Sequence, residues 1–384
     1  MRQKSSKLLP FILSAGNFVI GLGAFVVIGL ISPIATTFKA TPEQAGLALT
    51  YYAISYAIGA PLFAAFTGKM ARRWVLTGGL VLFALGAVGS ALAHTLGVFQ
   101  ASRLVVALGA GLFTPGAAAV AVTLSEPENR ARALSLVFAG LTLAQVLGVP
   151  LGSWAGYTFG IAATFWVVAG LALVAAVLVF AVTPPALPFQ PTSLSILGKT
   201  LLTPRLILPV LYSTTLMTAI YTVYTYLGPL IEERYGFGRN GVAAYLLLFG
   251  AAAVFGNFIG GYSADRVGPS RTLIVLCVAQ IILLPTIVIA PIGAITMGLL
   301  VVIWSLSGWS YMAPQQSRIV AIAPERAPVL LSLNASAILL GVALGSAIGG
   351  IALALGGWVM VAIASAGIAL GGIVHLILSD RLAK

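Results

Sequence analysis

Long apolar runs, cut off by charges or by glycine- and proline-rich turns, dominate the pattern of this 384-residue chain. A helix needs about 20 apolar residues to cross a bilayer. The strict polar–apolar alternation of membrane β-strands appears nowhere in the sequence. We therefore predict an all-α integral membrane protein with twelve transmembrane helices, whose cores lie at 9–32, 45–67, 75–93, 98–122, 134–155, 162–182, 206–230, 241–262, 273–290, 294–316, 328–353 and 358–378.

The composition agrees with a chain that lies in a bilayer. Hydrophobic residues make up 60% of the sequence and charged residues 7%, and the mean hydropathy is +1.08. An ordinary soluble domain carries about 25% charged residues, and so few charges cannot cover a water-facing surface of this size. A water-soluble fold is therefore excluded. Cys277 is the only cysteine, so no disulfide can form within the chain.

Lysine and arginine are distributed unevenly between the two sets of loops. If the N-terminus is cytoplasmic, 16 of the 20 basic residues lie on the cytoplasmic side, Arg318 among them, which predicts that both termini are cytoplasmic. The net charge of +12 arises from these scattered loop residues. We therefore expect a multi-pass protein of a bacterial cytoplasmic (inner) membrane, in contact with the lipid bilayer and without nucleic-acid binding.

Similar segments in the two parts of the chain indicate an internal repeat. GAPLFAAFTGKMARR begins at Gly59 and GNFIGGYSADRVGPSR at Gly256, while GVPLG at 148–152 reappears as GVALG at 341–345. The two offsets, 197 and 193 residues, nearly agree. We predict two pseudo-symmetric six-helix bundles in parallel orientation, at 1–183 and 206–384, joined by a proline-rich cytoplasmic loop at 184–205.

The loop after the eighth predicted helix carries the most specific motif. Its sequence, GYSADRVGPSR at 261–271, is similar to G-x-x-x-D-R-x-G-x-x-R, the loop signature of the major facilitator superfamily of secondary transporters. GLTLAQVLGVPLGSWAG resembles the fifth helix of the drug, sugar and nucleoside efflux branch, and LNASAILLGVALGSAIGG is a further match. The resemblance covers essentially the whole chain. It implies the major facilitator fold and transport by alternating access.

The loop signature also implies a gating role. A carboxylate at Asp265 can accept hydrogen bonds from a helix N-terminus and pair with arginine in one conformation only, which biases a two-state equilibrium. The alternative is a solvated loop charge of little energetic value. In the first repeat Gly68 occupies the position of this aspartate. The candidate gating residues are Asp265, Arg266, Gly268 and Arg271, with Lys69, Arg72 and Arg73 from the first repeat.

Small residues recur at every fourth position of the fifth and eleventh helices. They are Gly140, Ala144, Gly148, Gly152 and Gly156, and Ala337, Gly341, Gly345 and Gly349. This spacing predicts one small face on each helix, where backbones approach closely. Pro150 removes a backbone hydrogen bond and predicts a bend. Close packing alone and a flexible, sealed interface between the halves both stay open. The candidate hinge and packing residues are Gly148, Pro150, Gly152, Gly341 and Gly345.

Polar side chains form one stripe on each of two predicted helices. The seventh carries Thr214, Thr218, Tyr221 and Thr225, and the tenth carries Trp304, Ser307, Tyr311 and Gln315. Polar groups are costly against lipid, so these stripes are expected to face inward. The resemblance places helices 1, 4, 7 and 10 around a central cavity, which adds Asn17 and Arg103, with Gln145 and Asn334 as further candidates. A single hydroxyl is instead expected to bond its own helix.

Arg103, a few residues inside the fourth predicted helix, is the most informative single residue of the stripe candidates. An arginine within the membrane is a functional-site hypothesis by default. The alternative is that its long side chain extends to the outer interface. His375, near the end of the twelfth helix, is predicted to be a packed residue.

No buried carboxylate identifies a route for proton coupling. All eight acidic residues fall in loops or at predicted helix ends, and Glu232 and Glu233 are expected to be solvated charges at the outer end of the seventh helix. The sequence also lacks metalloprotease, nucleotide-binding and nucleophile motifs, so we expect no enzyme activity, no cofactor and no metal. Proton exchange, another form of coupling and uncoupled transport all stay open.

These features together favour a secondary active transporter that exports a small neutral or amphiphilic compound, such as a sugar, a nucleoside or a drug. Exchange for protons is one form of this prediction. The alternatives are a metabolite uptake carrier, an uncoupled facilitator, or a membrane receptor or scaffold that transports nothing. We expect the protein to be a monomer whose partners are its small-molecule substrate, the lipid bilayer and, for the coupled form, protons.

Overall fold

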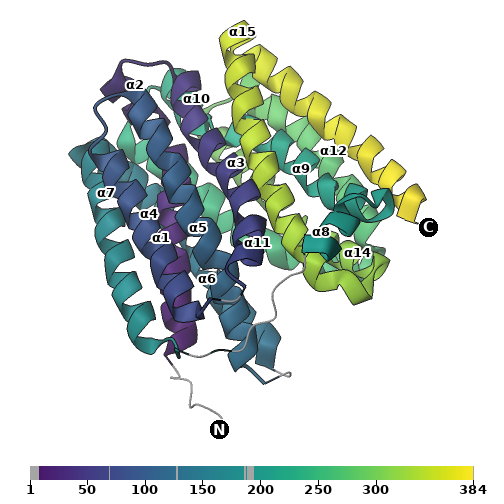
Figure 1. The fold of residues 1–384 in the computed structure, drawn as a ribbon. Helices are drawn as coiled ribbons and strands as arrows, with labels where there is room; N and C mark the ends of the chain where they lie inside the picture. Colours follow the sequence, from purple (N-terminus) through teal and green to yellow (C-terminus); the bar gives the residue numbers. More distant parts are fainter. Residues whose placement is uncertain (1–7, 69, 127–128, 186, 188–193, 384) are drawn as a thin grey trace.

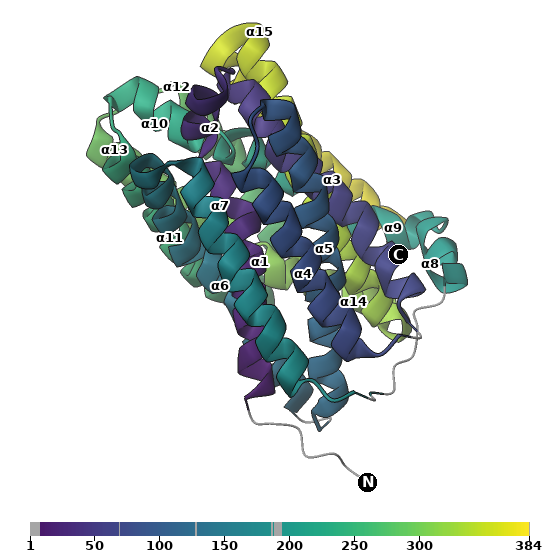
Figure 2. The ribbon, with the colours of Figure 1, turned by 60° about the vertical axis from the view of Figure 1, so that its left-hand side comes forward.

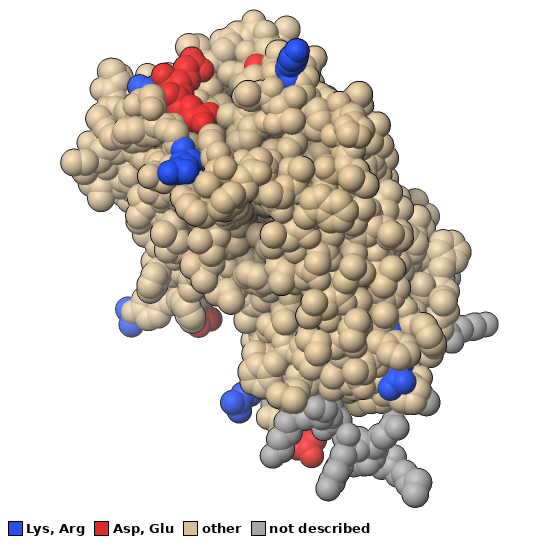
Figure 3. All heavy atoms as spheres, turned by 90° about the vertical axis from the view of Figure 1, so that its left-hand side faces the viewer, with Lys and Arg blue, Asp and Glu red and all other residues tan. Residues whose placement is uncertain are grey.

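The computed structural model describes residues 8–68, 70–126, 129–185, 187 and 194–383. These residues form helices and short connections, and no strand occurs among them (Figure 1). Ten helical stretches are long and apolar enough to cross a membrane. The predicted all-α membrane class is therefore confirmed. Figure 3 shows that Lys, Arg, Asp and Glu gather toward the two ends of one face, with a wide uncharged expanse between them.

The helices form two groups that lie side by side in Figure 1. The first group contains α1 (Leu9–Gly29), α2 (Ile31–Phe38), α3 (Pro42–Phe66), α4 (Arg72–Ala91), α5 (Leu96–Leu124), α6 (Arg130–Leu143), a π-helical turn (Ala144–Gly148) and α7 (Val149–Val182). After α8 (Leu194–Leu201), the second group contains α9 (Pro204–Tyr224), α10 (Leu227–Tyr235), α11 (Arg239–Val267), α12 (Pro269–Ile289), α13 (Ala294–Trp309), α14 (Met312–Ile322), a 3-10 turn (Pro324–Arg326) and α15 (Ala327–Ala383).

Two of the ten stretches are too long for one crossing. They span Arg132–Val182 and Val329–Leu382, 51 and 54 residues, where about 20 residues suffice. The backbone leaves the helical conformation at Gly160, with φ 84°, and at Gly356 and Gly357. Figure 1 shows α15 turning back on itself. Both breaks lie between predicted helix cores, at 155/162 and 353/358, while the count of twelve stays a prediction.

The fifth predicted helix does not simply bend at its proline. A π-helical turn over Ala144–Gly148 precedes α7, and Pro150 lies in the first turn of α7. Proline cannot donate the backbone hydrogen bond that a helix interior needs. The wider turn accommodates this loss one turn earlier, so the chain continues from α6 into α7 without a terminus between them.

The two small-residue stripes pack inside the groups and not between them. A Cβ on Gly140 would collide with the carbonyl oxygen of Ser14 in α1, and one on Gly152 with Val26 of α1. In the second group, a Cβ on Gly345 would lie 2.6 Å from the carbonyl oxygen of Thr218 in α9. Of the two open interpretations, the contacts support close packing, of α6–α7 on α1 and of α15 on α9.

Contacts between the two groups lie toward the end of the molecule that carries α2, α10 and the turn of α15, the upper end in Figures 1 and 2. Helix α15 packs against α3, and α11 packs against α7 and the π-helical turn. At this second contact, a Cβ on Gly250 would lie 2.7 Å from the Cα of Val146. The π-helical turn therefore belongs to the contact between the groups.

Candidate substrate path and gates

Arg103 lies wholly inside the first group, at 0% exposure. Its Nη2 donates to the carbonyl oxygens of Gly23, at 2.6 Å, and Ala24, at 3.3 Å, in α1. The guanidinium carbon lies 5.3 Å from the ring centre of Tyr52 and 5.5 Å from that of Phe165. Nε and Nη1 find no hydrogen-bond partner in the described part of the chain. The side chain therefore does not extend to an interface, and two of its donors are available to a ligand or water.

Asn17 ties three helices together in the same group. Its Nδ2 donates to the carbonyl oxygen of Val137 in α6 at 2.9 Å, and its Oδ1 accepts from the hydroxyl of Thr114 in α5 at 3.0 Å. Asn17 is fully buried on α1. Both ends of the amide are thus used by the protein, which makes Asn17 a packing residue in this conformation.

The polar stripe on α9 consists mostly of satisfied hydroxyls. Thr218 donates to the carbonyl oxygen of Thr214 in its own helix at 2.7 Å, and Thr214 donates to that of Ala337 in α15 at 2.8 Å. Thr225, fully buried beyond the end of α9, has no partner for its hydroxyl among the described residues. The stripe therefore offers an unused hydroxyl at Thr225, next to the helix end.

The stripe on α13 and α14 retains more unused polar atoms. The Ser307 hydroxyl donates to the carbonyl oxygen of Trp304 and accepts from Gln280. Trp304 and Tyr311 are both at 0% exposure. Neither the indole Nε1 of Trp304 nor the Tyr311 hydroxyl has a partner within the part of the chain that the structure covers. Buried polar atoms are nearly always satisfied, so these two are strong candidates for a ligand or an ordered water.

Aromatic rings surround Trp304. The ring of Tyr224 stacks on Phe249 with centres 4.1 Å apart, and Phe249 meets Trp304 edge-on at 4.9 Å. Tyr221 contacts Tyr224 edge-on at 5.4 Å. We refer to Tyr221, Tyr224, Phe249 and Trp304 as the aromatic cluster; all four are buried. It joins α9, α11 and α13 inside the second group.

Gln145 and Asn334, the two further candidates, occupy different settings. Gln145 is half-buried in the π-helical turn, where its backbone carbonyl oxygen lies against Gly250 of α11. The Oδ1 of Asn334 accepts from the hydroxyl of Ser213 at 2.6 Å and is buried between α9 and α15. The residues predicted to line one path are thus divided between separate clusters in the two groups.

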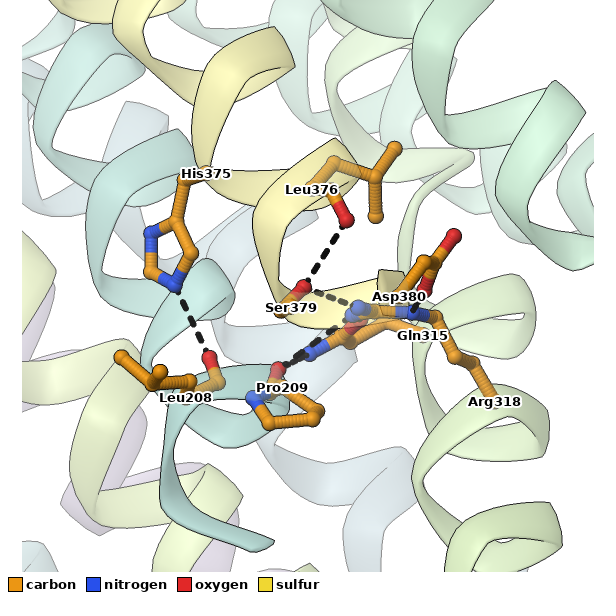
Figure 4. Close-up of polar contacts among 8 residues, drawn as sticks. All are labelled: Leu208, Pro209, Gln315, Arg318, His375, Leu376, Ser379 and Asp380. Atoms are coloured by element: carbon orange, nitrogen blue, oxygen red, sulfur yellow. Dashed lines mark hydrogen bonds and ion pairs between the residues drawn. The ribbon is translucent and has the colours of Figure 1, made fainter. Parts of the chain in front are cut away.

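A buried ionic cluster in the second group was not predicted from the sequence (Figure 4). Arg318, counted above as a loop charge, lies in α14 at 6% exposure, which corrects that assignment. Its Nε pairs with Asp380 at 2.7 Å, and its other nitrogens contact the Ser379 hydroxyl, Gln315 Oε1 and the carbonyl oxygen of Pro209. Gln315 itself donates to Pro209 at 2.7 Å. The cluster ties α14 to α9 and to the end of α15.

His375 lies beside this cluster and is fully engaged. One ring nitrogen contacts the carbonyl oxygen of Leu208 at 2.9 Å, and the other contacts the hydroxyl of Thr215 at 2.8 Å. Both partners belong to α9, so the imidazole fastens the last part of α15 to α9, as a packed residue does.

Most of the signature at 261–271 lies within α11 and α12, and only Gly268 lies between the two helices. Gly268 separates α11 from α12 with φ 92°, a conformation that favours glycine. Asp265 is exposed and has no hydrogen bond or ion pair with a described residue, and Arg271 is exposed as well. Arg266 lies over the ring of Tyr262 at 4.4 Å. In this conformation the Asp265 carboxylate is thus available to form a hydrogen bond or ion pair in another conformation of the protein.

The corresponding loop of the first group is built differently. Lys69 lies outside the described residues, and Arg72, in the first turn of α4, is 3% exposed. Arg73 donates to the carbonyl oxygen of Thr183 at 2.6 Å and lies 5.1 Å from the ring centre of Phe180. These two arginines therefore face into the first group, where Arg266 and Arg271 remain on the surface.

Close contacts at the upper end join the two groups. The hydroxyl of Ser346 in α15 donates to the carbonyl oxygen of Gly46 in α3 at 2.9 Å, and Thr50 donates to that of Ala343 at 3.4 Å. The Tyr226 hydroxyl donates to the Ser346 carbonyl oxygen at 2.9 Å. A Cβ on Gly46 would collide with this tyrosine. A side chain larger than glycine at this position would push α3 away from Tyr226 of the second group.

Of the two acidic residues expected to be solvated, Glu232 is engaged between the groups, whereas Glu233 stays exposed. Glu232 in α10 accepts from the hydroxyl of Tyr157 in α7 at 2.5 Å, which is a bond between the groups. Glu233 accepts from the indole of Trp358 at 2.8 Å. Glu232 is half-buried, whereas Glu233 is exposed. The expectation is thus wrong for Glu232 only, because its aromatic donor is 75 residues away in the chain and the local sequence does not reveal it.

The sequence of this chain is similar to those of known membrane transporters. Residues 13–328 match the family described as Major Facilitator Superfamily. An uncharacterized MFS-type transporter of Bacillus subtilis, YbcL, is 31% identical over 345 residues, covering 89% of this chain and 87% of that protein. The inner membrane transport protein YdhP of Escherichia coli K12 is 30% identical over 350 residues, covering 90% of this chain and 88% of that protein.

Solved structures share the fold. Crystal structures of a bacterial homolog to the human lysosomal transporter Spinster, in inward-facing occupied and unoccupied conformations, superpose with TM-scores of 0.78 and 0.76. Each superposition covers 98% of this chain and 97% of the other chain, and the sequence identity is 18%. At this identity the likeness shows the architecture.

Proposed function

Because the chain belongs to the major facilitator superfamily of membrane transporters, we propose that it is a secondary active transporter that exports a small neutral or amphiphilic compound by alternating access. We assign it twelve membrane-spanning helices in two bundles, at 1–183 and 206–384, with both termini in the cytoplasm. The breaks at Gly160 and Gly356–Gly357 support the count, because each divides a stretch twice too long for one crossing.

The observation that carries this proposal is the distribution of contacts between the groups. All four hydrogen bonds that join them among the described residues lie toward the upper end, and they involve Gly46, Thr50, Tyr157, Thr158, Glu232, Arg239, Ala343 and Ser346. A pair of bundles closed at one end is the expected form of one state in an alternating-access cycle. With cytoplasmic termini, that state is open toward the cytoplasm, where a substrate for export would enter.

The lining supports a substrate without a strong positive charge. No acidic residue pairs with the aromatic cluster or with Arg103 in the described structure, and the unused polar atoms nearest to them are mainly donors: Arg103 Nε and Nη1, and Trp304 Nε1. Such groups suit a ligand with hydrogen-bond acceptors and an apolar or aromatic part, as in a sugar, a nucleoside or a neutral drug. The efflux-type motif of the fifth helix favours the outward direction.

Flux measurements in proteoliposomes test this proposal. We expect a panel of labelled sugars, nucleosides and neutral drugs to contain at least one compound that moves, and an imposed pH gradient to change its rate if protons are exchanged. Flux that ignores the gradient would rule out proton exchange and favour the uncoupled facilitator. Movement only into the cytoplasm would favour uptake. No flux for any compound would favour a receptor or scaffold.

We further propose a gating role for Asp265. Its exposure in this state, and the one-residue link at Gly268, suit a carboxylate that gains a partner when the lower ends of the groups approach. Spin-label distances across the lower end should show a larger open population in Asp265→Asn than in the wild type. Equal populations and equal flux in the two proteins would contradict the gating role.

A further inference from the structure

Both repeats interrupt a helix at an equivalent position near the upper end of the molecule (Figures 1 and 2). Leu30 separates α1 from α2, and Tyr226 separates α9 from α10, 196 positions later. Their backbones are alike, with φ −113° and ψ 8° at Leu30 and φ −106° and ψ 16° at Tyr226. In each repeat a proline, Pro33 or Pro229, follows three residues later and lacks the N–H that would continue the helix. The interruptions are therefore a repeated feature, which leaves α2 and α10 as short separate helices.

The residues at the two interruptions pack against the last small residue of each stripe. Leu30 and Tyr226 are both at 0% exposure. A Cβ on Gly156 of α7 would collide with Leu30, and one on Gly349 of α15 would lie 2.9 Å from the ring of Tyr226. The two side chains thus occupy equivalent places in their own groups. Tyrosine differs from leucine in its greater length and in its hydroxyl, which can donate a hydrogen bond.

The greater length brings the Tyr226 hydroxyl to the first group. A Cβ on Gly46 of α3 would collide with this hydroxyl, and one on Gly350 of α15 would lie 2.6 Å from it. The hydroxyl donates to the Ser346 carbonyl oxygen at 2.9 Å, and the Ser346 hydroxyl donates to the Gly46 carbonyl oxygen at 2.9 Å. The end of the ring therefore lies in a slot between the two groups, which the absence of side chains at Gly46 and Gly350 leaves open.

We propose that Tyr226 is a latch for the upper end: its ring, inserted between Gly46 and Gly350, stabilises the closed contact of α3 with α15. The upper end opens when α10 moves about the interruption and withdraws the ring from this slot. The role of Tyr226 rests on the alternating-access cycle proposed above, which requires a state that is open at the upper end. Leu30 cannot donate a hydrogen bond, so opening at the upper end is governed by the second group.

Loss of the hydroxyl alone tests its hydrogen bond. Tyr226→Phe removes the bond to Ser346 and keeps the ring, so the ratio of open to closed molecules should rise about fivefold, which corresponds to one hydrogen bond. Tyr235→Phe is the matched control. Tyr235 also lies in α10, but its hydroxyl donates to the Ile292 carbonyl oxygen at 2.9 Å, inside the second group. This variant should keep the wild-type ratio.

A substitution on the opposite side of the slot tests the contact between the groups. The three atoms nearest to a Cβ on Gly46 all belong to Tyr226, so Gly46→Ala should open the upper end more strongly than Tyr226→Phe. Tyr226→Leu gives this position the residue of the first repeat, whose side chain ends well short of the hydroxyl position. In that background Gly46→Ala should change the ratio little further.

The measurement is the distance between spin labels at the upper ends of the two groups in the full-length protein, in lipid nanodiscs without substrate. The labels are attached through His94→Cys, between α4 and α5, and Ile295→Cys in α13, because both residues are exposed. The buried Cys277 is replaced by alanine in all variants. The fraction of long distances gives the open population.

Two results would overturn the latch. The first is the same open population in Tyr226→Phe as in Tyr235→Phe, and the second is an equal effect of Gly46→Ala in the wild-type and Tyr226→Leu backgrounds. Either result leaves the export proposal intact. If instead no variant, Gly46→Ala included, shows a longer distance, the upper end does not open, and alternating access fails together with the latch.

Discussion

Arg103 in the first group and Arg318 in the second are both buried, yet their surroundings differ. Arg318 is paired with Asp380 and also contacts a hydroxyl, an amide and a carbonyl oxygen. Arg103 has two carbonyl oxygens and two aromatic rings, and it forms no ion pair with a described residue. A satisfied buried charge fastens helices, whereas a partly satisfied one keeps donors for a ligand. We therefore expect substitutions at the two sites to affect different properties.

The largest effect on stability is expected when Asp380 is removed. Asp380→Ala leaves the Arg318 guanidinium buried without its carboxylate, and breaking such a pair costs about 3 kcal/mol or more. Chemical unfolding in detergent measures this loss. Asp265→Ala is the control, because that acid is exposed and its removal should change stability by less than about 0.5 kcal/mol. If the two variants were equally stable, the carboxylate of Asp380 would not stabilise the buried Arg318, and Arg318 would no longer differ from Arg103 in this respect.

Substitution of Arg103 should affect transport and leave stability intact. Arg103→Met replaces a buried charge that has no ion pair among the described residues with an apolar side chain of similar length, which removes the cost of keeping that charge out of water. Loss of charged donors to a ligand costs about 1.5–3 kcal/mol, so flux should fall at least about tenfold. Arg103→Lys keeps the charge but loses the planar fork and should also be impaired. Wild-type flux in Arg103→Met would show that the free donors serve no ligand.

The smallest effect is expected at the edge of the Arg318 cluster. Ser379→Ala removes one contact of Arg318 and keeps Asp380 in place, so the free energy of unfolding should fall by about 1 kcal/mol. Thr114→Val removes the hydroxyl that donates to Asn17 in the first group, and a similar loss is expected. A loss from Ser379→Ala as large as that from Asp380→Ala would mean that the hydroxyl, and not the carboxylate, satisfies Arg318.

The sequence predicted well what depends on long apolar runs. The membrane class and the positions of the breaks at Gly160 and Gly356–Gly357 follow from run length and turn residues, and the family follows from the loop signature at 261–271. Contacts made by distant helices were missed. The local sequence indicates a loop charge at Arg318, because its partners Pro209 and Asp380 lie more than 60 residues away in the chain. The bond of Tyr157 to Glu232 cannot be predicted from local sequence for the same reason, since 75 residues separate the two.

The candidate site shows the same limit at the level of single side chains. Polar stripes on α9 and α13–α14 were predicted from their spacing, but spacing alone does not separate a satisfied hydroxyl from an unused one. Thr218 is bonded within its helix, and Thr225, seven residues later, is without a partner among the described residues. The backbone of Thr225 is still helical, so the difference lies in side-chain contacts, which the spacing of residues does not encode.

The π-helical turn has a geometric consequence for the small-residue stripe beside it. Residues four apart on a regular α-helix are rotated by about 40° from one another, so a strict four-residue repeat winds off its face within a few steps. Yet Gly140, Ala144, Gly148 and Gly152 all contact α1, and Gly156 contacts Leu30, the residue that follows α1. A π-turn advances less than 100° per residue, and over Ala144–Gly148 it reverses part of that winding. The turn thus corrects the rotation of the repeat, so that the small residues before and after it stay on the side that faces α1.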